Sequence, residues 1–238
     1  MINPAELESL DVFETRTKQV LVELNSKPII ADMLQQLRSQ LPKNLKYHNG
    51  IEEENSETPT HTEDVLHDTI LFALADGIND EHALELLGIM ASFHDAAFLK
   101  QYANNEDICA SMATEAMREA GYSEDDCTTV YDGIIATKVE MVGGILTQRK
   151  APNQLAGYVL DGDVSNFGRP DFRHKSDLIL EELKLQYPDK PPVEKGFLTS
   201  AYHFIKNHEW NTQAAKRLRS PQQQINIQNL GLELDLVA

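Results

Sequence analysis

LELLGIMASFHDAAF, residues 84–98, is an apolar run that ends in a His-Asp pair. Its apolar residues recur at the three-and-four spacing of a helix, and an apolar run of about ten residues leads up to the pair. His94 and Asp95 close the run, so two ionisable side chains should face the protein core. Burying such groups is unfavourable unless they are paired or bind a metal ion. A core histidine that only hydrogen-bonds to its neighbour is the simpler alternative.

The same helical spacing continues on both sides of this run. Glycine and proline interrupt it where helices must end, at 26–28, 42, 77, 121, 143–144, 152 and 188–192. No stretch shows sustained apolar and polar alternation, and the periodic segment from Thr128 is expected to stay helical to Val142. The sequence therefore predicts an all-α fold with about eight to ten helices.

A chain of 238 residues is within the range of one domain. We expect N-terminal helices over 1–45 to pack on a main domain over 46–219, followed by a polar tail over 220–238. The acidic segment 49–60 predicts an exposed loop that leads into a helix capped near Thr60 or Thr62. The tail, SPQQQINIQNLGLELDLVA, reads as irregular and leaves open whether it packs on the body, pairs with a partner or stays mobile.

The formal charge of -17, from 38 acidic and 21 basic residues, disfavours binding to DNA, RNA or anionic membranes. No apolar window is long enough to span a bilayer, and the start, MINPAELESLDVFE, lacks the basic-then-apolar pattern of a signal peptide. A cytoplasmic protein is therefore expected. Cys109 and Cys127 fall in helical patterns and are expected to be buried thiols, neither paired nor catalytic.

Metal-dependent hydrolysis requires imidazoles and carboxylates that converge on one point and leave room for water and substrate. Four residues on predicted helices meet this need: His61 in HTEDVLHDTI, the pair His94-Asp95, and Asp163 in GYVLDGDVSNFG. A second His-Asp pair, His67-Asp68, falls in mid-helix among acidic residues and reads as a solvated face.

In chain order these residues read HT…HD…D, with Tyr47-His48-Asn49 before them and LDGDVSNFGRPDF after them. This order resembles the HD superfamily of metal-dependent phosphohydrolases, and within it bacterial members with a YHN…HT start and an LxDADLxxLGRxDF element. The likeness runs from Tyr47 to Phe172, and FIKNHEWNTQAAKRL resembles the C-terminal helix of that group. It implies an HD-type helical bundle over 46–219.

The resemblance implies that one divalent ion is bound by His61, His94, Asp95 and Asp163. Asp161 is the alternative last ligand, although its expected role is to cap or hydrogen-bond nearby. Mn, Fe, Co, Ni, Zn and Mg all suit such a site. Members with two metals need further histidines after the doublet, but none occurs between His94 and His174, which favours a single ion.

The resemblance also suggests catalytic and substrate-binding residues. Asp95 would orient the attacking water, and Glu106 is a candidate auxiliary acid or base unless it only stabilises a helix start. Three residues are candidates for binding substrate phosphate: Lys138, Arg169 and His48. Each has an alternative, because Lys138 fits a surface lysine, Arg169 could pair with Asp171 or Asp161, and a long gap to His61 could displace His48. His203, His208 and Trp210 fit packing roles.

These features predict a metal-dependent phosphohydrolase, either a phosphomonoesterase or a phosphodiesterase, that acts on a nucleotide or another small phosphate ester through a metal-activated water. One alternative is a nucleotide-sensing module without turnover, because Asn105 stands where many relatives have a histidine. A less favoured one is an iron-dependent oxygenase on the same fold. A homo-oligomer is compatible with the sequence.

Overall fold

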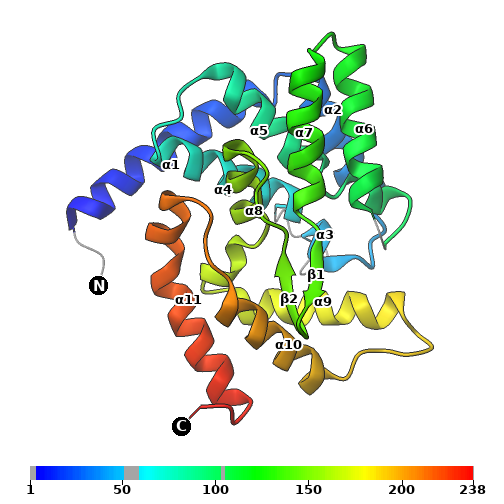
Figure 1. Cartoon of the computed structure of the whole chain (residues 1–238), viewed down its shortest axis with the longest axis vertical. Coiled ribbons are helices and arrows are strands. Elements are labelled where there is room, and N and C mark those ends of the chain that lie inside the picture. The colour runs from blue at the N-terminus through cyan, green and yellow to red at the C-terminus, as the bar shows by residue number, and fades with distance from the viewer. Residues whose placement is uncertain (1–3, 51–58, 103–104, 238) are drawn as a thin grey trace.

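Helices α4 (His61–Ala75) and α5 (Glu81–Phe93) form the centre of the computed structural model, which describes residues 4–50, 59–102 and 105–237 (Figure 1). Thr60 caps α4 through a capping box, in which its hydroxyl accepts from the Glu63 amide and its own amide donates to the Glu63 carboxylate. Thr60 is thus one of the two predicted caps. The acidic loop predicted before it falls largely on 51–58, which lie outside the described residues.

The remaining elements surround this pair. They are α1 (Pro4–Leu24), α2 (Pro28–Gln40), α3 (Lys46–Asn49), the 3₁₀ turn η1 (Ala96–Leu99), α6 (Glu106–Glu119), α7 (Glu124–Ala136), β1 (Val139–Val142), β2 (Ile145–Gln148), α8 (Gln154–Asp163), the 3₁₀ turn η2 (Ser165–Gly168), α9 (Phe172–Gln186), α10 (Glu194–Asn207) and α11 (Gln213–Glu233). The described residues thus form an all-α, single-domain fold with eleven α-helices and one short hairpin. The predicted fold class is confirmed.

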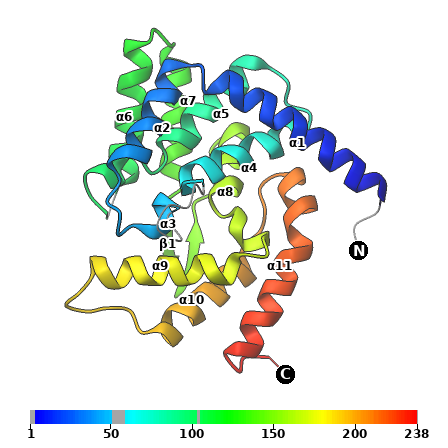
Figure 2. The ribbon, with the colours of Figure 1, turned by 180° about the vertical axis from the view of Figure 1, so that it is seen from behind.

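The main core forms around α4 and α5. Helix α4 packs against α1, α5 and α8, and α5 packs against α2, α7 and α8. Seen from behind, α1 and α2 cover this central pair (Figure 2). Every residue of α5 from Leu86 to Phe93 is buried, which fits its apolar sequence.

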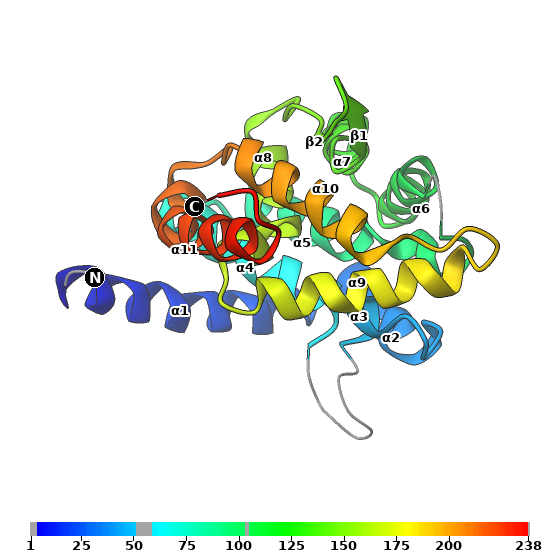
Figure 3. The same ribbon diagram turned by 90° about the horizontal axis from the view of Figure 1, so that it is seen from below.

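A second, smaller core lies between η2, α9, α10 and α11. Figure 3 shows α9 and α10 running side by side, with α11 next to them. Their contact includes the buried side chains of Phe167, Phe172, Leu198, Tyr202 and Leu230. Asp163 and Val164 end α8 at the border of the two cores, so this border positions the candidate site.

The predicted helix from Thr128 to Val142 is wrong in its last part. Helix α7 ends at Ala136, and Val139–Val142 pairs antiparallel with Ile145–Gln148. Gly143 and Gly144 form the two-residue turn with φ of 59° and 85°, a left-handed conformation that glycine adopts without strain. The glycine pair therefore closes a hairpin.

The prediction of an irregular tail from Ser220 is also wrong, because α11 runs through it to Glu233. Two polar residues of the tail are buried because their side-chain amides bond to backbone carbonyls. Gln223 donates to Ile205 and His208, and Asn226 donates to Phe167 and Arg169. A pattern of apolar residues does not reveal the full length of such a helix, because its buried face is partly polar.

Two smaller predictions concern the thiols and the membrane. Cys109 and Cys127 are both buried and free, as predicted. No helix among the described residues is both long and apolar enough to cross a membrane.

Candidate metal centre

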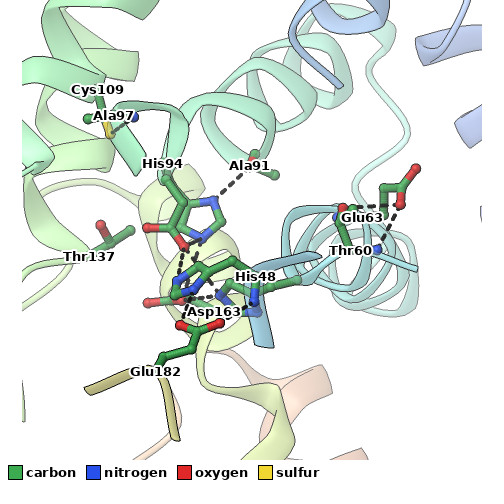
Figure 4. A network of polar contacts seen from close by, with 12 residues as sticks. His48, Thr60, Glu63, Ala91, His94, Ala97, Cys109, Thr137, Asp163 and Glu182 are labelled. Carbon is green, nitrogen blue, oxygen red and sulfur yellow. Dashed lines mark hydrogen bonds and ion pairs between the residues drawn. The ribbon is translucent and has the colours of Figure 1, made fainter. Parts of the chain in front are cut away.

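Three helix ends meet at one point beside the central pair. His61 is the first residue of α4, Asp163 is the last residue of α8, and His94 and Asp95 follow directly after α5. Figure 4 shows His94, Asp163 and His48 gathered around this point. The negative ends of the α5 and α8 dipoles and the positive end of the α4 dipole meet there, so two of the three helix ends favour a cation.

The four predicted ligands lie at spacings that suit one shared ion. His61 Nε2 is 3.5 Å from Asp95 Oδ2 and 3.3 Å from Asp163 Oδ1, and His94 Nε2 is 3.2 Å and 3.6 Å from the same two oxygens. Neighbouring ligands at about 2.0–2.2 Å from one ion are roughly 3.0–3.6 Å apart. Among the described residues, the ligand atoms of His61, His94 and Asp95 lie within 4.8 Å of one another, and Asp163 lies outside this group but next to both imidazoles.

The imidazole of His94 carries the clearest sign of a bound cation. Its Nδ1–H donates to the Ala91 carbonyl at 2.7 Å, which leaves a lone pair on Nε2. Nε2 is buried without a hydrogen-bond partner and faces two carboxylates. A lone pair in this position is repelled by the carboxylates unless a proton on Nε2 or a metal ion lies between them. The residues present therefore fit a metal ion.

The charges of the four candidate ligands also favour a positive charge between them. Burial lowers the pKa of His94, but Asp95 and Asp163 more than offset this and hold the pKa well above its ordinary value. Burial raises the pKa of both carboxyls, yet His94 and His61 bring each pKa below its usual range. The cluster thus stabilises a positive charge at its centre, supplied by a proton or by a metal ion.

Gln148 orients Asp163 from the second strand of the hairpin. Its Nε2 donates to Asp163 Oδ2 at 3.0 Å and to the Leu160 carbonyl at 3.3 Å. Oδ1 is thereby left for the two imidazoles. The sequence analysis missed Gln148, because only the hairpin brings it to the site; a Gly-Gly pair between two β-branched runs was the available signal.

His48 lies at the site and is not displaced by the long gap before His61. Its Nδ1 is 2.7 Å from Glu182 Oε2, its backbone amide donates to Glu182 Oε1, and its Nε2 is 3.6 Å from Asp95 Oδ2. Glu182 is fully buried on α9 and fixes the orientation of the His48 ring. Sequence reasoning missed Glu182, which has no local motif to mark it.

Asp161 faces away from the site and binds Asn211 and Thr212, the two residues just before α11, of which Thr212 is the helix cap. Its two oxygens accept hydrogen bonds from the backbone amides of Asn211 and Thr212 and from both side chains, all at 2.8–2.9 Å. Burial raises the pKa of Asp161, and these four donors oppose that effect. The structure thus favours Asp163 over Asp161 as the fourth ligand, in agreement with the sequence order.

Three other predicted site residues are not brought to the cavity. Arg169 pairs with Asp171 at 2.9 Å and with Asp64 at 3.3 Å, so its predicted role in phosphate binding gives way to the ion-pair alternative with Asp171. Neither Glu106, at the start of α6, nor Lys138, just before β1, is among the described residues that line the cavity.

The pair His67-Asp68 was predicted to be solvated, and for Asp68 this is wrong. Asp68 is 3% exposed and pairs with Arg219 of α11 at 2.8 Å, with Ser165 of η2 and with His67 at 3.0 Å. The local pattern could not reveal a partner 151 residues away.

His208 and Trp210 pack as expected. Their rings meet edge-on at 4.7 Å, and burial lowers the pKa of His208 to about 4, with Asp163 acting in the opposite direction. His203 is exposed on α10.

A cavity of about 430 Å³ opens onto three of the four candidate ligands, His61, Asp95 and Asp163, and His94 lies behind them, outside the described residues that line it. His48, His61, Asp95 and Asp163 form its polar end, and aromatic and aliphatic side chains form most of the remaining wall. This volume is within the range of small-molecule sites. Comparison of the chain with protein-family models, with curated proteins and with solved structures found no match.

Proposed function

We propose that this protein is a metal-dependent phosphohydrolase that acts on a small phosphate ester. The observation that carries the proposal is the convergence of His61, His94, Asp95 and Asp163, in which the buried Nε2 of His94 lies 3.2 Å and 3.6 Å from two carboxylates at the polar end of the cavity. The order of ligands along the chain, which resembles the HD superfamily, agrees with it. One divalent ion, held by His61, His94, Asp95 and Asp163, is expected per chain.

When bound, such an ion supplies a water of lowered pKa and neutralises charge on the phosphoryl oxygens. The protein's own groups then have distinct tasks. Asp95 Oδ2 lies between His94, His61 and His48, at 3.2–3.6 Å from a nitrogen of each, so this carboxylate can bind the ion and orient the water. Gln148 keeps Asp163 turned towards the imidazoles.

His48 is the group best placed to move a proton. Glu182 accepts from Nδ1 and fixes the ring orientation, while Nε2 points to Asp95 at the mouth of the metal cluster. His48 Nε2 could thus take a proton from the attacking water or give one to the leaving oxygen. His48 thus joins Glu106 as a candidate acid or base.

The experiment measures bound metal and phosphate release together. Protein stripped with a chelator is reloaded with Mn²⁺ or Zn²⁺, its metal content is determined by elemental analysis, and inorganic phosphate is measured with a panel of phosphate esters. We expect about one ion per chain and release that depends on it. Asp95→Ala should lose both while its circular dichroism stays helical. Asp132→Ala, an exposed aspartate on α7, is the control that should keep both.

Each other outcome points elsewhere. Full metal content and activity in Asp95→Ala would refute the proposal. One ion per chain with binding but no hydrolysis of any nucleotide or ester would favour the nucleotide-sensing alternative. Two irons per chain in freshly purified protein, measured before the chelator is applied, would favour the oxygenase alternative.

A further inference from the structure

The cavity wall beyond the candidate ligands is mainly apolar. Five phenylalanines of the described residues line it: Phe98, Phe167, Phe172, Phe197 and Phe204. Aliphatic side chains from β1, β2 and α9 complete the wall, among them Val139, Leu146 and Leu183. Such a surface binds aromatic or aliphatic groups through burial of their apolar area.

The cavity has no cationic side chain to pair with additional phosphates. None of the described residues that line it is a lysine or arginine, and the residues outside the description (1–3, 51–58, 103–104 and 238) include none in their sequence. Two cations lie near its wall, but both face Asp64: Arg169 at 3.3 Å and Lys175 at 3.8 Å. Two carboxylates already balance the charge of one divalent ion, so a second or third phosphate would lack a counter-charge.

The cavity is also poor in donors for a sugar or a base. The hydroxyls of Ser176 and Ser200 donate to carbonyls of their own helices, Phe172 at 2.8 Å and Gly196 at 3.1 Å. Asn166 is the one carboxamide among the described lining residues, and Tyr47 and Tyr102 add two phenol hydroxyls. These groups are fewer than the hydroxyls and base-edge groups of a nucleotide, so a buried nucleotide would lose water contacts without gaining as many partners.

We infer that the cavity takes a phosphate ester with one phosphoryl group on an apolar aromatic or aliphatic body, and that it discriminates against nucleotides. This inference rests on the proposed function and narrows its substrate class. The phosphoryl group lies at the polar end, next to His61 and Asp95, and the apolar body extends along the phenylalanines.

The first test measures binding, so it does not depend on turnover. The metal-loaded full chain is titrated calorimetrically with 1-naphthylmethylphosphonate, methylphosphonate and AMP. We expect the naphthyl compound to bind at least about 30-fold more tightly than methylphosphonate, and at least about 10-fold more tightly than AMP. Equal dissociation constants, or tighter binding of AMP, would overturn the inference.

The second test places a charge in the wall. Leu183→Lys adds a cation to the cavity, and Leu185→Lys adds the same cation two residues along α9, where the native leucine is 55% exposed. Leu183→Lys should weaken naphthyl binding at least about 10-fold and raise kcat/KM for ATP relative to 1-naphthyl phosphate. Leu185→Lys should change neither. If Leu183→Lys does not fold, Leu183→Ala replaces it, and we expect this variant to bind the naphthyl compound more weakly than the original protein, by a smaller factor.

The two failures are distinguishable. Hydrolysis of ATP or AMP as fast as that of 1-naphthyl phosphate would refute the apolar substrate class and leave the phosphohydrolase intact. A chain that binds the naphthyl phosphonate selectively but releases no phosphate from any ester would refute hydrolysis and keep the apolar binding site.

Discussion

At the scale of single residues, Asp161 and Asp163 lie on the same helix but have different partners. Asp163 faces two imidazoles, whereas Asp161 accepts four hydrogen bonds from Asn211 and Thr212 at the start of α11. We predict that Asp163→Asn loses most bound metal with little change in the free energy of unfolding. Asp161→Asn should instead lose about 1–3 kcal/mol of stability and keep its metal.

Elemental analysis and urea unfolding of both variants at neutral pH decide this prediction. Each variant is the control for the other, because the substitution and the helix are the same. If Asp161→Asn lost the metal and Asp163→Asn kept it, the assignment of the last ligand would be reversed.

Gln148 offers a residue-scale test of how the ligands are positioned. Removing its amide frees Asp163 Oδ2, so the carboxylate can rotate away from the imidazoles. Loss of a group that orients a metal ligand typically weakens metal binding about 10–100-fold. We predict this loss for Gln148→Met, measured by competition with a coloured chelator.

The matched control is Thr147→Val, the exposed neighbour on β2. Its side chain lies on the opposite face of the strand, so metal affinity should be unchanged. Unchanged affinity in Gln148→Met would show that Asp163 is held in place by other contacts.

At the scale of elements, the approach of α8 to α4 determines where Asp163 lies. A Cβ on Gly162 would fall 2.4 Å from Thr69 Oγ1 and 3.0 Å from the Val65 carbonyl, so the two helices would have to separate. We predict that Gly162→Ala destabilises the fold by about 1–3 kcal/mol and weakens metal binding. Gly196→Ala on α10, where the added Cβ meets nothing within 4 Å, should stabilise it by up to about 1 kcal/mol.

Thermal unfolding of the two variants tests the opposite signs. A Gly162→Ala protein as stable as the original would mean that α4 and α8 adjust without strain. Destabilisation by Gly196→Ala would show that the same substitution is harmful irrespective of space.

The sequence predicted the elements wherever apolar residues alone determine burial. The central helix around Leu87 and the cap at Thr60 are of this kind, because a local pattern is enough to determine them. The hairpin and α11 were missed for two reasons. A glycine pair can end a helix or close a turn, and the buried face of α11 is formed partly by Gln223 and Asn226.

The candidate site follows the same division. His61, His94, Asp95 and Asp163 could be named in advance, because buried ionisable groups stand out against apolar neighbours. Gln148 and Glu182 could not, because their importance comes from contacts across 15 and 134 residues of chain. Partners that orient a ligand have no fixed spacing, so only the fold brings them together.

At the scale of the whole molecule, one chain of polar contacts joins its N- and C-terminal helices. Glu14 of α1 contacts His67 at 3.0 Å, His67 contacts Asp68 at 3.0 Å, and Arg219 of α11 pairs with Asp68 at 2.8 Å. Arg219 Nε also donates to Ser165 of η2 at 2.7 Å. These contacts link α1, α4, η2 and α11, and most of them involve ionisable side chains.

The directions of the pKa shifts of Asp68 and His67 determine how the free energy of unfolding changes with pH. Burial raises the pKa of Asp68, but Arg219 and His67 bring it well below its usual range, so its contribution is present above about pH 4 and is lost in acid. Burial lowers the pKa of His67, but Asp68 and Glu14 raise it overall. Its contribution is therefore full below about pH 6.5 and is lost as the pH rises through the folded-state pKa.

We predict that His67→Gln lowers the free energy of unfolding by about 0.5–1 kcal/mol at pH 6, and that this difference shrinks by pH 9. Asp68→Asn should lose about 2–4 kcal/mol at pH 7, because Arg219 would keep its charge without a counter-ion. Urea unfolding across this pH range measures both effects.

His82→Gln is the control. His82 contacts Asp126 at 2.9 Å, but its side chain is 55% exposed, so the loss of this contact should change stability by only a few tenths of a kcal/mol. A His67→Gln difference that grew towards pH 9 would have the wrong sign, and the contact with Asp68 would then stabilise the neutral ring rather than the charged one.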